Sequence, residues 1–148
     1  MAEIDRKAVI AALDKILEAE LAGVVRYTHY SFMIFGYNRI PIVSWLRGQA
    51  SESMAHAQEA GELITALGGH PSLGIGHLLE THKHDIGQIL TEALEHEREG
   101  LAQYHQLLKV VEGRSIMLEE YARKMIAEEE GHICEVEKML RKPGELDA

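Results

Sequence analysis

The feature that most constrains the fold of this chain is a set of acidic and imidazole side chains at positions where a helix would otherwise be apolar. Counting in steps of three and four residues keeps to one face of a helix. In four segments this count gives mostly Leu, Ile, Val, Ala and Met, interrupted by Glu20, His56, Glu97, Glu129 and His132. A charged carboxylate inside such a stripe is costly unless a counter-charge offsets it. No Lys or Arg lies on these stripes, so the pattern predicts a cation inside a bundle of helices.

Start and stop signals divide the chain into helices. Pro41 is a start signal, Gly68-Gly69 a stop signal, and Ser115 an N-cap. The stretch 70–83 is rich in Gly, His and Pro and is too long for a tight hairpin, which predicts a crossover. The expected fold is all-α, a four-helix bundle with a long crossover between helices two and three and no fifth helix. The predicted helices run from about Asp5 to Phe35, Ile42 to Leu67, Asp85 to Val111, and Ser115 to Leu140.

The bulk composition narrows the class of protein. A chain of 148 residues with three prolines fits one helical domain over residues 1–148. A net charge of −9 disfavours nucleic acid as a partner. The N-terminus has no apolar signal core, no run of residues can span a membrane, and the single Cys134 excludes an intrachain disulfide. We therefore expect a cytoplasmic protein with no membrane partner.

The central acidic and imidazole groups predict a metal centre. Three glutamates and two histidines on different helices need a shared counter-charge, which two divalent ions supply directly; the alternative is a bundle with partly solvated acidic residues. Carboxylate and imidazole ligands without thiolate suit iron, manganese or zinc. Iron is the usual occupant of such a site, so we expect two iron ions per chain, with manganese or zinc as alternatives.

Three short segments carry a family resemblance. They are Glu20-Leu-Ala-Gly-Val-Val-Arg-Tyr27, Glu97-Arg-Glu-Gly100 and Glu129-Glu-Gly-His132. Together the chain, from Ala11 to about Leu140, resembles the bacterioferritin branch of the ferritin-like di-iron superfamily. The resemblance implies that Glu20 and Glu97 bind the metals terminally, Glu129 bridges them, and His56 and His132 each bind one. It also implies oxidation of Fe(II) by O₂ or peroxide, and in many members storage of ferric mineral in a cage.

The chain departs from the family pattern in the second helix. There the family has Glu-x-x-His, but Ser53 stands three residues before His56, and Glu52 stands four before it. Glu52 is rotated by about 100° from Ser53 and by about 40° from His56. Three interpretations remain open. Glu52 replaces the bridging ligand, the site is asymmetric with weak or single-metal occupancy, or the ferroxidase chemistry is lost.

The assembly is expected to differ from the family's large cages. The sequence continues for only sixteen residues after His132, whereas bacterioferritins have a short fifth helix that helps to build the cage. Apolar residues also surround the end of the first predicted helix, more than one face of a bundle can bury. We expect a homodimer, or a larger homo-oligomer, with the first two helices at the interface.

Other residues have weaker signals. Met54 matches the methionine that binds haem across a dimer axis in bacterioferritins; ordinary packing is the alternative. Tyr27 and Tyr104 share the ligand stripes, as hydrogen-bonding or one-electron partners of the metals or as core tyrosines. His82 and His84 form a weak His-x-His signal. The remaining histidines are expected at the surface or in caps: His29, His70, His77, His96 and His105.

Three functions follow. The first is a ferritin-like di-iron protein that oxidises Fe(II), a ferroxidase for iron storage or detoxification. The second is a small oligomeric di-metal oxidoreductase that removes peroxide and stores no iron. The third is a non-enzymatic bundle that binds metal structurally, which Ser53 favours. The assembly size separates the first from the second, and metal content with O₂ consumption separates both from the third.

Overall fold

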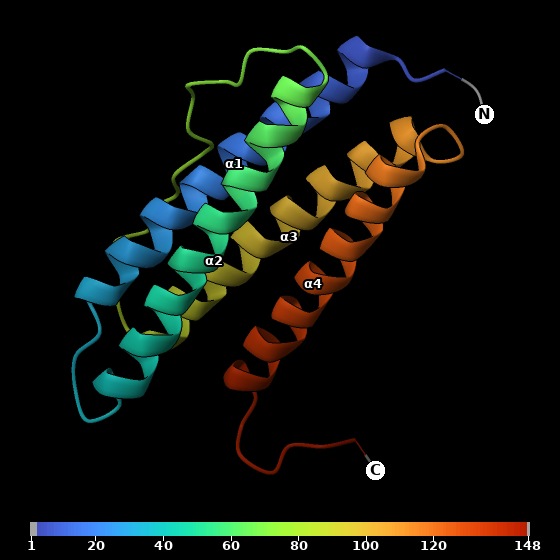
Figure 1. Cartoon of the computed structure of the whole chain (residues 1–148). Helices are drawn as coiled ribbons and strands as arrows, with labels where there is room; N and C mark the ends of the chain where they lie inside the picture. The colour runs from blue at the N-terminus through green and yellow to red at the C-terminus, as the bar shows by residue number, and fades with distance from the viewer. Residues whose placement is uncertain (1–2, 148) are drawn as a thin grey trace.

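The computed structural model describes residues 3–147, and α-helix is the only regular secondary structure in that range. Four helices run up and down along one another (Figure 1). The predicted all-α bundle with four helices is confirmed. The helices are α1 (Arg6–Phe32), α2 (Arg39–Ala66), α3 (Ile86–Val111) and α4 (Ile116–Leu140).

Side-chain caps define where three of the helices begin. The side chains of Asp5, Asp85 and Ser115 accept hydrogen bonds from backbone N–H groups three residues further on, and so satisfy donors that have no partner within the helix. The predicted N-cap at Ser115 is therefore confirmed. Gly68 follows the last turn of α2 with φ +83°, a left-handed conformation that glycine adopts without steric cost.

Two helix boundaries differ from the prediction. Helix α1 ends at Phe32, and beside its end the Arg39 side chain donates hydrogen bonds to the carbonyl oxygens of Ser31, at 3.3 Å, and Ile34, at 2.8 Å. Helix α2 begins at Arg39, ahead of Pro41. A proline in the first turn removes no intrahelical hydrogen bond, since those N–H groups have no acceptor in the helix.

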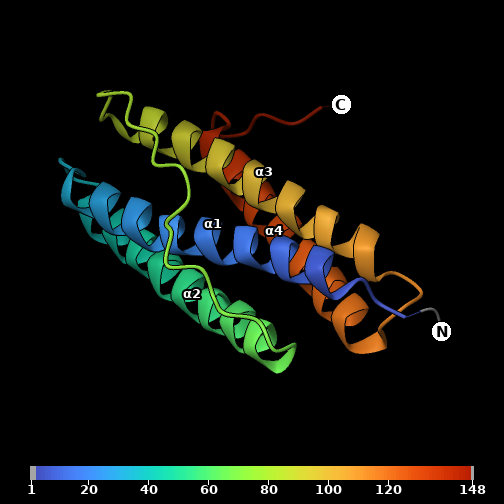
Figure 2. The ribbon, with the colours of Figure 1, turned by 90° about the horizontal axis from the view of Figure 1, so that it is seen from above.

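The crossover between α2 and α3 is held against α1. It passes across α1 on its way from the end of α2 to the start of α3 (Figure 2). The N–H of Ser72 donates to Asp14 at 2.9 Å, and the N–H of Gly76 donates to the Glu18 carbonyl at 2.8 Å. The buried Arg26 donates to the His77 carbonyl at 2.8 Å. The predicted long crossover is thus present and is anchored along the helix.

The apolar core is interrupted midway along the bundle. One core cluster includes Leu13 of α1 and Leu107 of α3, and a second includes Tyr30 of α1 and Ile89 of α3. Glu20 and Glu97 lie between these clusters in the sequences of their helices. The four helices therefore enclose a polar layer between two apolar ends. Within residues 3–147, no helix is long and apolar enough to cross a membrane.

Candidate metal centre

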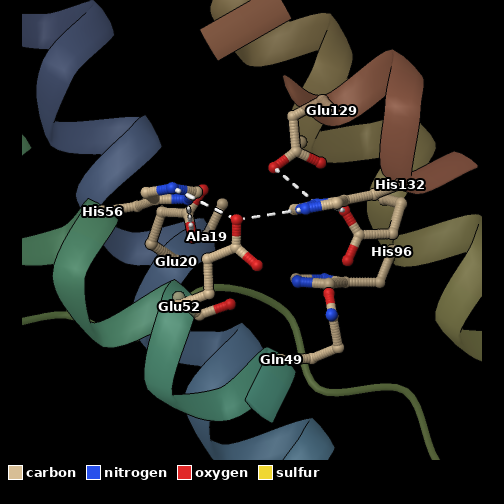
Figure 3. Close-up of a pocket in the computed structure, with 11 residues that line it drawn as sticks. Ala19, Glu20, Gln49, Glu52, His56, His96, Glu129 and His132 are labelled. Atoms are coloured by element: carbon tan, nitrogen blue, oxygen red, sulfur yellow. Dashed lines mark ion pairs between the residues drawn. The ribbon is translucent and has the colours of Figure 1, made fainter. Parts of the chain in front are cut away.

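The polar layer forms a pocket to which every helix contributes. Figure 3 shows its side chains converging from the four helices. Glu20 comes from α1, His56 from α2, Glu97 from α3, and Glu129 and His132 from α4. The five side chains that the stripes predict on inner faces thus lie together, and the sixth predicted ligand, Glu52, lines the same pocket. The complete lining is Ala19, Glu20, Gln49, Glu52, Ser53, His56, His96, Glu97, Gly100, Glu129 and His132.

Two groups of ligand atoms share one carboxylate. Oxygen and nitrogen atoms of Glu20, His56 and Glu129 lie within 4.8 Å of one another, as do those of Glu97, Glu129 and His132. The glutamates are buried, with exposed fractions of 8% for Glu20, 6% for Glu97 and 4% for Glu129. A buried carboxylate common to two groups of ligands has the placement of a bridge between two cations.

Burial and mutual repulsion give the glutamates unequal proton affinities. Burial, together with a hydrogen bond and the negative charge of Glu97, raises the pKa of Glu129 to about 12. Burial also opposes ionisation of Glu97, but hydrogen bonds from Glu129 and Tyr27 outweigh it, and the pKa of Glu97 is lowered. A proton on Glu129 thus reduces the repulsion, which is the role that a bound cation would also fill.

A buried tyrosine hydrogen-bonds each of the two glutamates that belong to only one group of ligand atoms, Glu97 and Glu20. The Tyr27 hydroxyl donates to Oε1 of Glu97, and the Tyr104 hydroxyl donates to Oε1 of Glu20 at 2.9 Å. Burial raises the pKa of both tyrosines above the usual value, and the adjacent glutamate adds to the shift. Both hydroxyls therefore stay protonated and remain donors, which orients the carboxylates toward the pocket.

Glu52 reaches the pocket although it lies off the stripe of α2. Its Oε1 is 3.1 Å from Nε2 of His132 and 3.9 Å from Nε2 of His56 (Figure 3). Ser53 is buried, lines the pocket and also faces α1. Its Oγ lies 2.8 Å from the position that a Cβ at Gly23 would occupy, so a larger residue at Gly23 would meet it.

His96 lies inside the bundle, contrary to the prediction from the sequence. It was expected at the surface or in a cap, but only 9% of it is exposed and it lines the pocket beside Glu97. His29, His70, His77 and His105 are exposed, as predicted. His96 lies about 100° around α3 from Glu97, so counting along one stripe excludes it. Burial lowers the pKa of His96 and favours a neutral imidazole.

Glu128 was also missed. Its Oε2 lies 3.1 Å from Nε2 of His56, and its carboxylate forms a third group with Glu52 and His56 within 4.8 Å. Glu128 is partly exposed, so this third group lies at the mouth of the pocket. The sequence signal for it was its position four residues before His132, the spacing that also relates Glu52 to His56.

Met54 and the apolar residues after α1 lie away from the pocket. Met54 is 39% exposed and lines a shallow groove with residues of α1 and α2, among them Val24 and Arg47. Beyond α1, Phe35 is 79% exposed and Ile40 is 84% exposed. One subunit alone thus leaves apolar side chains at the junction of α1 and α2 exposed.

Solved structures share this fold. A ferritin-like, diiron-carboxylate protein from Bacillus anthracis has 24% identity and a TM-score of 0.87, with 95% of this chain and 100% of that chain covered. A dodecameric thioferritin, the bacterioferritin-related protein of Bacteroides fragilis, has 22% identity and a TM-score of 0.84, with coverage of 93% and 87%. Rhodobacter capsulatus bacterioferritin, solved with a metal-free dinuclear site and haem iron, has 23% identity and a TM-score of 0.81, with coverage of 94% and 86%.

Sequence comparison assigns the family. No protein of curated function matches the chain significantly. The ferritin-like domain, however, matches residues 10–144, nearly the whole sequence. The predicted resemblance is therefore confirmed, and with four helices, a long crossover and a central layer of carboxylates and imidazoles, this chain belongs to the ferritin-like domain family.

Proposed function

We propose that this protein binds two iron ions per chain in the polar layer and oxidises Fe(II) with O₂ or peroxide. The observation that carries the proposal is the position of Glu129 in two groups of ligand atoms. Glu20 and His56 hold one ion, Glu97 and His132 hold the other, and Glu129 lies between them. Manganese and zinc suit the same ligands. Fe(II) is the substrate, and as a bound pair it supplies the electrons that reduce the oxidant.

Glu52 takes the place of the carboxylate that is absent at Ser53. This role is supported by the distance of 3.1 Å between Oε1 of Glu52, on α2, and Nε2 of His132, on α4. Its partial exposure, 38% of the side chain, distinguishes it from the buried Glu129. We therefore expect Glu52 to bind the ions more loosely than Glu129 does, and to leave one side of the centre open to solvent and oxidant.

Tyr27 supports the chemistry at Glu97. Its buried hydroxyl donates to that carboxylate. Such a donor fixes the direction in which a ligand presents its second oxygen, and it also places an oxidisable ring beside the centre. We propose the first role, orientation of Glu97, as the main one, with one-electron transfer from Tyr27 as the catalytic alternative.

The assembly is proposed to be a homodimer or a larger homo-oligomer. The exposed apolar residues Phe35 and Ile40 support an interface at the junction of α1 and α2. The Bacteroides fragilis relative is dodecameric, and the Rhodobacter capsulatus relative carries haem iron. Haem at Met54 would need a second subunit, because Met54 lies on an open face of α2.

Oxidation of Fe(II) by the apo-protein tests the proposal. Fe(II) is added anaerobically, O₂ is admitted, and ferric absorbance is followed against the iron added. Fast oxidation with a break at two irons per chain supports the di-iron ferroxidase. A break at one iron, or oxidation at the rate of buffer alone, contradicts it. Glu129→Gln should remove the fast oxidation. Glu130→Gln, at the exposed position next to Glu129, is the control and should keep it.

A second candidate is a di-metal peroxide-scavenging oxidoreductase that stores no iron. The open mouth formed by Glu52 and Glu128 favours it, because a small oxidant can reach the centre from solvent. Peroxide consumption and native mass separate the candidates: storage requires a closed shell with more iron than the centres hold. A metal-loaded protein that consumes neither oxidant would indicate a non-enzymatic bundle.

A further inference from the structure

A second group of metal-binding side chains lies in the crossover, outside the polar layer. Ligand atoms of Glu80, His82 and His84 lie within 4.8 Å of one another, and all three residues are exposed. Nε2 of His84 is 3.2 Å from Oε1 of Glu80. None of these residues lines the central pocket.

Helix α1 places a fourth side chain next to this group, on the other oxygen of Glu80. His29, in the last turn of α1, places its Nε2 3.2 Å from Oε2 of Glu80. The two oxygens of Glu80 therefore face two different segments, the crossover and α1. Side chains from segments more than fifty residues apart in sequence meet at this one carboxylate.

The backbone holds the group in place without a metal. His82 has φ +57°, in the left-handed region that few non-glycine residues adopt. Its N–H donates to Oε1 of Glu80, and the preceding N–H, of Thr81, donates to the buried Glu92 at 2.9 Å. This turn brings His82 and His84 to the same side of Glu80, so little rearrangement is needed to close the group around an ion.

We propose that Glu80, His82 and His84 bind one divalent cation of the Zn(II) type, and that the exposed His29 side chain rotates toward it from Oε2 of Glu80 to become the fourth ligand. Three imidazoles and one carboxylate match the nitrogen and oxygen ligands and the four-coordinate geometry that Zn(II) prefers. The bound ion joins the crossover to the last turn of α1. This site shares no ligand with the polar layer, so it does not depend on the function proposed for that layer.

The test counts metal ions bound per chain. The full-length protein is loaded with Zn(II), passed through gel filtration and analysed for metal, and Zn(II) binding is measured by calorimetry. His82→Ala/His84→Ala should hold one ion fewer per chain than the wild type. The matched control, His70→Ala/His105→Ala, removes two exposed histidines elsewhere and should hold as many ions as the wild type. Equal metal content in all three proteins would overturn the proposal.

A second measurement reports the position of the ion. Zn(II) should slow amide hydrogen exchange in residues 77–84 of the wild type and of the control, but not in His82→Ala/His84→Ala. His29→Ala should weaken Zn(II) binding at this site while the turn stays folded. Unchanged affinity in His29→Ala would exclude His29 as a ligand, and unchanged exchange in the wild type would exclude a site in the crossover.

Discussion

Oε1 of Glu52, on α2, lies 3.1 Å from Nε2 of His132, on α4. These helices belong to different halves of the chain, one before and one after the crossover. The contact joins the two halves at the mouth of the pocket, next to the position where Ser53 lacks a carboxylate. It makes Glu52 the residue whose substitution best separates the interpretations of this centre.

Replacement of Glu52 by glutamine should weaken binding of the second metal ion. The amide keeps the size of the side chain but removes its charge, and loss of even an outer-sphere partner typically costs roughly 10- to 100-fold in metal affinity. Metal titration of Glu52→Gln is compared with Glu62→Gln, on an exposed position of the same helix. Equal two-ion binding by both variants would exclude Glu52 as a ligand.

Removal of either tyrosine hydroxyl should lower metal affinity by roughly 10- to 100-fold. Tyr27→Phe removes the tyrosine donor to Glu97, and Tyr104→Phe removes the one to Glu20. Tyr121→Phe is the control for packing, because the buried Tyr121 ring packs edge-on against Tyr104, with 6.2 Å between the ring centroids, while no hydrogen bond joins its hydroxyl to Glu20 or Glu97 within the described residues. Isothermal titration with Fe(II) under anaerobic conditions measures the effect; the same loss in all three variants would point to general packing instead.

Substitution of Gly23 by alanine should lower the free energy of unfolding, because the added Cβ would crowd side chains that line the pocket. A Cβ there would stand 2.8 Å from Oγ of Ser53 and 3.1 Å from Nε2 of His96, closer than ordinary contacts. Gly61→Ala has open space and should stabilise its helix by about 0.5–1 kcal/mol. Urea unfolding measures the free energy of unfolding of both variants.

A second substitution shows whether the contact with Ser53 causes the loss of stability in Gly23→Ala. Ser53→Ala removes the closest atom, so Gly23→Ala/Ser53→Ala should recover part of the stability. If Gly23→Ala is as stable as the wild type, the neighbouring side chains move aside at no cost.

Removal of metal should lower the thermal stability of the protein. An ion that binds only the folded state adds about 2.7 kcal/mol at a free concentration of about 100 times its Kd, and here it would also offset repulsion among the buried Glu20, Glu97 and Glu129. Differential scanning calorimetry with and without chelator measures the change in Tm. Glu97→Gln/Glu129→Gln should respond to metal much less; an equal response would place the stabilising ion elsewhere, with the crossover group as the next candidate.

Polar substitutions at the end of α1 should weaken self-association. Phe35→Ser/Ile40→Ser removes two of the most exposed apolar side chains, with 79% and 84% exposure. Ile116→Ser/Met117→Ser changes two exposed apolar residues at the start of α4, at 65% and 61% exposure, and is the control. Sedimentation velocity should show a smaller species for the first variant alone. No change in either variant would exclude the junction of α1 and α2 as the interface.

The sequence was sufficient for the helices and for most of the pocket. Each helix carries a stripe with the 3.6-residue period, so the apolar positions and the acidic residues among them are assigned to one face without a structure. The N-cap at Ser115 and the stop at Gly68 are local signals of the same kind. The stripes alone therefore placed Glu20, His56, Glu97, Glu129 and His132 on inner faces.

The tertiary structure decided which side chains join these residues from outside the stripes. His96 and Glu52 lie off their stripes. They still reach the pocket, because their side chains are long enough to extend from the edge of a helix face toward the space between the four helices. The pairing of His29 with Glu80 depends on the path of the crossover along α1. Sequence by itself thus determined helix positions and inner faces, since these depend on local periodicity. Only the packing of the helices and the path of the chain between them decided which groups lie within contact distance.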